Sequence, residues 1–284
     1  MADKGFFRRA AAAAGIVSGI WTFLTKPRTD KKQEVEDLGK WDFAHRGYHN
    51  AEAGVPENSM AAFRLAVVHD SDLERMTGQK VQIEDLTLEE ARELRLGGTE
   101  ETIPSLNEVL ETVNGQTPIL VEIKVARNNV EALTSTAMEL LDGYEGEYLV
   151  ESFDPRVLSW LRKNRPEVLR GQLLTNLKKE GNTDYPEALD FSLRNLLTNC
   201  WTRPDFIAYN VKYRGNLSLR LAGMLYGVPE FDWTIRSGEE YCLIRKEGGV
   251  PIFEGFDPRL LKEEAAEEAD ETADKTDAVT EEYL

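Results

Sequence analysis

Short apolar runs alternate along the chain with segments of helical periodicity. Seven runs predict buried strands, at residues 41–44, 118–123, 148–153, 169–174, 206–209, 231–235 and 250–253. Apolar residues at helical spacing predict helices at 58–66, 87–95, 105–113, 128–141, 155–164, 185–197, 217–225 and 238–246. Repeated strand–helix units of this kind predict an α/β fold, a parallel sheet with helices outside it.

Polar residues stand at the carboxyl ends of several predicted strands: His45 with Arg46, Glu122 with Lys124, Asp154, Asn210 and Arg236. In a (β/α) barrel the active site forms at that rim, so the pattern favours a TIM-like (β/α) barrel. A closed barrel has eight strands, and the seven found here predict a barrel that is incomplete or distorted.

The first forty residues differ from the rest. Residues 10–24 are apolar except for Ser18 and Thr22, and Lys or Arg residues flank the run on both sides. We expect residues 1–40 to form an uncleaved hydrophobic anchor, with a transmembrane helix, followed by a charged linker. The protein would then be membrane-associated, with the side of the membrane undetermined. The alternative is an alanine-rich arm that lies on a surface or is disordered.

The chain is acidic, most of all toward its C-terminus. The formal net charge of −17 argues against a nucleic-acid partner. Much of this charge lies in residues 259–284, which we expect to form an acidic, disordered tail, leaving residues 41–258 as the barrel. Cys200 and Cys242 have no metal-binding spacing, and the simplest interpretation is that each is a buried free thiol.

The candidate chemistry lies near the front of the predicted barrel. Two histidines can exchange protons near neutral pH, and His45 and His69 are the candidates, whereas His49 lies in a loop where a surface position is expected. Arg46 can hold phosphate oxygens through its planar fork, and the alternative is an ion pair with Glu57 at the rim. Lys124 stands two residues beyond Glu122, so both side chains leave the strand on one side.

Four segments carry a resemblance to a known family: Phe43-Ala44-His45-Arg46-Gly47, Val55-Pro56-Glu57-Asn58-Ser59, Val67-Val68-His69-Asp70 and Leu120-Val121-Glu122-Ile123-Lys124. In their residues and in their order along the chain, these segments resemble the motifs of the glycerophosphodiester phosphodiesterase family. The resemblance implies hydrolysis of small glycerophosphodiesters to glycerol 3-phosphate and an alcohol. It further implies His45 and His69 as general acid and base, Arg46 and Lys124 as phosphate-binding residues, and Glu122 with Glu57 as ligands of Ca²⁺ or Mg²⁺.

One part of the family pattern is missing. Between the helix that ends near Ala66 and His69, the family has a second strand with a metal-binding Glu-x-Asp, and here the sequence runs straight through. We therefore expect the distortion near the second strand and a weakened metal site. Three hypotheses remain open: a phosphodiesterase whose activity is reduced or lost, a non-catalytic phosphate-binding or membrane-tethered scaffold, and a defective product without a role.

Overall fold

Seven parallel strands form one sheet. The computed structural model describes residues 4–50, 53, 55–63, 73–125, 127–181 and 186–261. Its strands are β1 (Phe43–Ala44), β2 (Ile119–Glu122), β3 (Tyr148–Ser152), β4 (Arg170–Leu174), β5 (Phe206–Asn210), β6 (Glu230–Ile235) and β7 (Val250–Phe253). All seven lie where apolar runs predict them, and the sheet order is β1-β7-β6-β5-β4-β3-β2.

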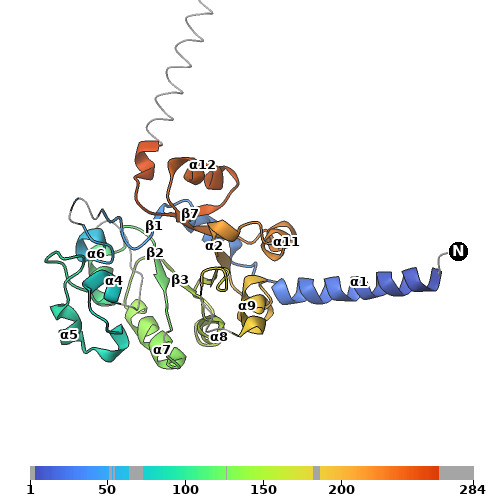
Figure 1. The fold of residues 1–284 in the computed structure, drawn as a ribbon, viewed down its shortest axis with the longest axis horizontal. Coiled ribbons are helices and arrows are strands. Elements are labelled where there is room, and N and C mark those ends of the chain that lie inside the picture. The colour runs from blue at the N-terminus through green and yellow to red at the C-terminus, as the bar shows by residue number, and fades with distance from the viewer. Residues whose placement is uncertain are drawn as a thin grey trace, which may run out of the picture.

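The sheet curls into a nearly closed, TIM-like barrel with one unsealed seam (Figure 1). The seam lies between the two edge strands, because β1 pairs with β7, β2 pairs with β3, and no pairing joins β1 to β2. The predicted fold class, a TIM-like barrel that falls short of full closure, is therefore confirmed.

Helices that follow the strands cover the outside of the barrel: α7 (Val130–Leu141), α8 (Pro155–Asn164), α9 (Glu187–Arg194), α10 (Asn199–Thr202), α11 (Leu217–Tyr226) and α12 (Gly238–Lys246) (Figure 1). Several begin with the caps that their sequences suggest. The Asp154 side chain accepts a hydrogen bond from the Arg156 amide, and the Asn216 side chain accepts two, from the Ser218 and Leu219 amides. Such caps satisfy amides that have no partner within the helix.

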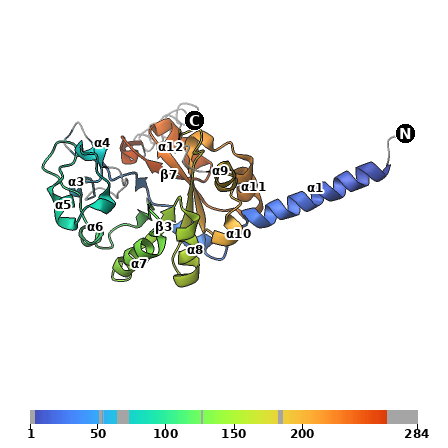
Figure 2. The ribbon, with the colours of Figure 1, turned by 60° about the horizontal axis from the view of Figure 1, so that its bottom comes forward.

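The chain between β1 and β2 forms a lobe beside the barrel (Figure 2). It contains α3 (Met60–Phe63), α4 (Glu74–Thr77), a 3₁₀ turn (Ile83–Asp85), α5 (Leu88–Glu93) and α6 (Leu106–Val113). Thr87 and Ser105 form complete capping boxes at the last two helices. The described residues of this segment contribute two isolated bridges and no strand of the barrel sheet.

The barrel interior is packed with apolar side chains. Phe206 and Phe231 stack with ring centroids 4.5 Å apart. The cluster to which they belong also contains Val35, Leu38, Phe43, Leu149, Leu169, Leu173, Ala208, Val250 and Ile252. The first two of these residues come from α2 (Lys32–Leu38), so part of the predicted linker is a helix that packs into the barrel. In the sequence, this packing is indicated by Val35 and Leu38, which lie three residues apart and so on one face of a helix. The many charged residues around them conceal the pattern.

The N-terminal segment forms a single helix, α1 (Lys4–Thr25), that projects from the barrel (Figures 1 and 2). Its last turns are fixed to the body, because Tyr226 donates a hydrogen bond to the Thr22 carbonyl and Asn199 donates one to the Thr25 carbonyl. Across the described part of the chain, no helix has both the length and the apolar character needed to cross a membrane. The transmembrane helix expected within residues 1–40 is therefore not found in the described part of the chain.

Candidate functional site

His45 lies at the carboxyl rim of the barrel. It follows β1, and its amide donates a hydrogen bond of 2.7 Å to the carbonyl of Phe253 at the end of β7. Phe43 packs in the barrel interior, while Ala44 packs against the outer cluster beside α12. Because side chains alternate along a strand, His45 is directed to the same side as Phe43, into the mouth of the barrel.

A carboxylate from the neighbouring strand holds this imidazole. The Nδ1 atom of His45 lies 2.7 Å from Oε2 of Glu254, the residue that directly follows β7. The two side chains are only 13% and 19% exposed. A carboxylate bound to Nδ1 fixes the orientation of the ring, so that proton exchange with a ligand would take place at Nε2.

The surroundings keep Glu254 ionised. Burial raises the pKa of this carboxyl, but the hydrogen bond and positive charge of His45, together with Arg236 and Arg46, outweigh burial and lower the pKa to about 2. Arg236 contributes a hydrogen bond of 3.2 Å from Nε to Oε1. Basic side chains therefore surround the partly buried carboxylate of Glu254.

Arg46 occupies a strained turn beside this pair. Its φ of 59° lies in the left-handed region, which residues other than glycine rarely adopt, and Gly47 follows with a φ of 88°. This backbone geometry directs the Arg46 side chain toward Glu57, and Nη1 lies 2.9 Å from Oε1. The ion pair that the sequence left as an alternative is thus formed.

Glu122 and Lys124 stand on the other side of the seam, at the end of β2. Leu120 packs against the interior cluster, so the alternation of side chains directs Glu122 into the barrel. Together with Lys124 it lines a cavity of about 220 Å³. Apolar side chains form most of the remaining wall: Ile123, Val125, Phe153, Leu173, Leu174, Leu177 and Leu193.

The described residues do not assemble the expected metal site. Nowhere among them do three His, Cys, Asp or Glu side chains gather closely enough to hold an ion. Glu57 pairs with Arg46, and a cation at this carboxylate opposes the binding of a second one. The donor set needed for six-coordinate Mg²⁺ or for Ca²⁺ is therefore incomplete in this part of the chain. His69, the second expected acid–base residue, lies outside the described residues.

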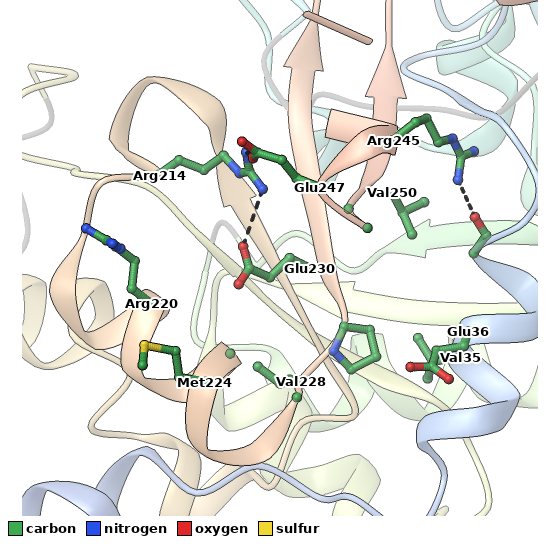
Figure 3. A pocket seen from close by; sticks show the side chains of 16 residues that line it. Val35, Glu36, Arg214, Arg220, Met224, Val228, Glu230, Arg245, Glu247 and Val250 are labelled. Atoms are coloured by element: carbon green, nitrogen blue, oxygen red, sulfur yellow. Dashed lines mark hydrogen bonds and ion pairs between the residues drawn. The ribbon is translucent and has the colours of Figure 1, made fainter. Parts of the chain in front are cut away.

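A second cavity, of about 540 Å³, lies at the opposite end of the barrel. Figure 3 shows Arg214 between Glu230 and Glu247, with Nη1 2.5 Å from the latter. Nε of Arg214 also lies 2.7 Å from Oδ1 of Asp232, which is fully buried. Burial raises the pKa of Asp232 to about 7 despite this cation. None of the expected site residues lines this cavity, in which Arg214 pairs with Glu230 and Glu247.

Sequence reasoning missed one residue of the rim, Glu254. The signal was present, because Glu254 directly follows an apolar strand, as His45 and Arg236 also do. His49, expected at the surface, is instead partly buried, whereas Cys242, expected to be buried, is exposed. The Nε2 atom of His49 has no hydrogen-bond partner within the described structure.

Comparison with known proteins decides the family. The model of the glycerophosphoryl diester phosphodiesterase family matches residues 64–214, more than half of the chain. The chain belongs to this family. A glycerophosphodiester phosphodiesterase of Bacillus altitudinis is 30% identical in an alignment over 161 residues that covers 44% of this chain. The match spans 63% of that relative, less than two thirds of its length.

Solved structures support the fold of this family member. A phosphodiesterase of Oleispira antarctica, solved with the product sn-glycerol-3-phosphate, has a TM-score of 0.61 at 20% identity, covering 78% of this chain and 94% of that one. A glycerophosphodiester phosphodiesterase of Thermotoga maritima has a TM-score of 0.55 at 23% identity, covering 78% and 96%. At these identities the likeness concerns the barrel itself.

Proposed function

We propose that this protein hydrolyses glycerophosphodiesters to glycerol 3-phosphate and an alcohol. The observation that carries the proposal is the pair of His45 and Glu254 at the carboxyl rim, with Arg46 next in the chain. A histidine oriented by a carboxylate is suited to proton transfer at neutral pH. The product bound to the Oleispira antarctica relative gives the substrate class.

Each residue has a role in this proposal. Arg46 and Lys124 neutralise the phosphate from opposite sides of the seam, and Arg46 exchanges part of its bonding to Glu57 for phosphate oxygens. His45 transfers a proton to or from the ester through Nε2, while ionised Glu254 stabilises the imidazolium that forms. His69 is assigned the complementary acid–base role on its sequence motif. In this family a divalent metal supplies further charge neutralisation, for which Glu122 would be one ligand and Glu57 another only after release from Arg46.

We also propose that the chain lacks the family strand that bears Glu-x-Asp. The seam between β1 and β2 supports this, because the missing strand would lie there and would raise the count from seven to the usual eight. The barrel portion, residues 41–258, is also shorter than the roughly 250 residues of a typical TIM barrel. Loss of two carboxylates would weaken metal binding and reduce turnover.

The test is an assay for glycerol 3-phosphate released from glycerophosphocholine, with Ca²⁺, Mg²⁺ and Mn²⁺ supplied separately. The proposal predicts slow, metal-stimulated release that falls by about 10² or more in His45→Asn. The control is Glu139→Gln, which alters an exposed carboxylate near the end of α7 that does not line the cavity at the rim. Equal release by His45→Asn and the unsubstituted protein would reject the assignment.

A non-catalytic phosphate-binding role is the second candidate. It is favoured by the incomplete donor set among the described residues, because phosphate binding needs cations but no metal. Calorimetry with glycerol 3-phosphate separates the two candidates. Binding that is lost in Arg46→Ala, combined with no turnover under any metal, would select this second function.

A further inference from the structure

Helix α1 exposes a continuous apolar surface. Ile16, Val17, Ile20 and Phe23 are 55–65% exposed, although the last turns of the helix are fixed to the barrel. Large apolar side chains normally lie inside a soluble domain, and several exposed together on one projecting helix mark an interaction surface. The helix extends well away from the rest of the molecule (Figures 1 and 2).

Exposed apolar residues on neighbouring helices extend this surface at the base of α1. Phe191 of α9 contacts Trp21, with ring centroids 6.4 Å apart, and is itself 42% exposed. Trp201, 46% exposed, belongs to α10, the helix that packs most extensively against α1. Aromatic side chains of this kind are typical of the boundary between a bilayer and water.

The charge of this segment is opposite to that of the protein. Residues 4–26 contain four Lys and Arg and no Asp or Glu, whereas the whole chain has a net charge of −17. α1 itself contains no carboxylate. A cationic, apolar segment on an acidic protein is complementary to an anionic bilayer, whereas two copies of the same segment would repel each other.

We propose that α1, together with Phe191 and Trp201, binds the surface of an anionic lipid bilayer. The helix lies in the interface, with Ile16, Ile20 and Phe23 among the acyl chains and the flanking cations among the headgroups. This surface is separate from the rim of the barrel, and the proposal does not depend on the proposed hydrolysis. It replaces the expected transmembrane anchor by a helix that lies on the membrane.

Co-sedimentation of the full chain with vesicles tests this. One set is phosphatidylcholine alone, and the other is an equal mixture of phosphatidylcholine and phosphatidylglycerol. We expect binding to the mixed vesicles that weakens with added salt, and a fall of at least about tenfold in the Ile16→Glu, Ile20→Glu double variant. The matched control is the Leu88→Glu, Leu243→Glu double variant, which places the same charges at positions 49% and 51% exposed on α5 and α12.

Three outcomes would overturn the proposal. The first is an absence of binding to the mixed vesicles. The second is equal loss of binding in both double variants. The third is a lipid-free dimer, detected by light scattering, that the Ile16→Glu, Ile20→Glu variant abolishes while vesicle binding is absent. Because all four positions are exposed, both variants should melt at the temperature of the unsubstituted protein, which shows that each is folded.

Discussion

At the residue scale, the rim is organised by a contact between side chains that are far apart in the sequence. His45 and Glu254 are separated by 209 positions, and they meet because β1 and β7 are neighbours. Arg236 reaches the same carboxylate from the end of β6. The ionised carboxylate of Glu254 thereby orients the imidazole of His45 and also pairs with Arg236.

Replacing Glu254 by Gln should lower kcat by about tenfold to a hundredfold and leave KM within a few-fold. The amide can still accept a hydrogen bond from Nδ1, but it lacks the charge that stabilises the imidazolium. Steady-state kinetics on glycerophosphocholine measure the effect. Arg236→Gln is the control, since this side chain is 60% exposed and should matter less. A kcat that is unchanged in Glu254→Gln would remove Glu254 from the mechanism.

Asp232 should make the protein less stable as the pH rises from about 4 to about 7. Its pKa is raised from 3.8 to about 7, so over this interval the folded state keeps a proton that the unfolded state has lost. The difference corresponds to at most about 4 kcal/mol. Asn does not titrate, so the melting temperature of Asp232→Asn should fall less steeply over the same interval.

Thermal melts at several pH values measure how steeply the melting temperature falls with pH. The slopes are compared because the loss of a partner of Arg214 lowers the melting temperature by the same amount at every pH. Glu93→Gln, at an exposed position on α5, is the control and should leave the slope unchanged. Parallel curves for Asp232→Asn and the unsubstituted protein would show that Asp232 does not titrate in this range.

At the element scale, local patterns predicted the strands and most helices. Most strands are runs of largely apolar residues, although β4 also contains buried Arg170 and Gln172. Capping residues such as Thr87 and Ser105 indicate where helices begin. Ser59 also caps as expected, since its Oγ accepts a hydrogen bond from the Ala62 amide. The helix predicted at 185–197 is shorter and spans Glu187–Arg194. Leu196 has a φ of 62°, which is incompatible with a right-handed helix, so the helix cannot extend to residue 197.

What the sequence could not predict depends on contacts between distant elements. Charges around Val35 and Leu38 conceal the apolar pair that packs α2 into the barrel. The partner of His45 depends on which strand lies beside β1, and spacing along the chain carries no such information. Arg46 and Glu57, eleven residues apart, could be paired from the sequence because one short loop joins them.

An inserted strand tests the proposed gap in the barrel. A family segment bearing Glu-x-Asp, placed between Ala66 and His69, should fill the seam and increase metal-stimulated hydrolysis. We expect an increase of about tenfold or more, the order of the rate contribution of one catalytic group or metal ion. Calorimetry with Mn²⁺ measures metal binding independently of turnover. The same segment with both carboxylates replaced by amides is the control. Equal activity of the two insertions would contradict the account of the missing strand.

At the scale of the whole molecule, charge is divided between regions. The cationic segment from residue 4 to residue 26 stands apart from a barrel and C-terminal sequence rich in Asp and Glu. Within the barrel, carboxylates surround Arg214 at the amino end, whereas at the carboxyl end His45, Arg46 and Arg236 lie near Glu254, in a rim that also holds Glu57. The second arrangement suits an anionic ligand.

The most direct test of that claim is a nuclear magnetic resonance titration of the ¹⁵N-histidine-labelled protein with glycerol 3-phosphate. The chain has only three histidines, so a His45→Asn sample assigns the resonance of His45. The account predicts a saturable shift of the His45 ring signals that is lost in Arg46→Ala. Ring signals of His45 that stay unchanged at saturating ligand would contradict both the hydrolytic and the phosphate-binding function.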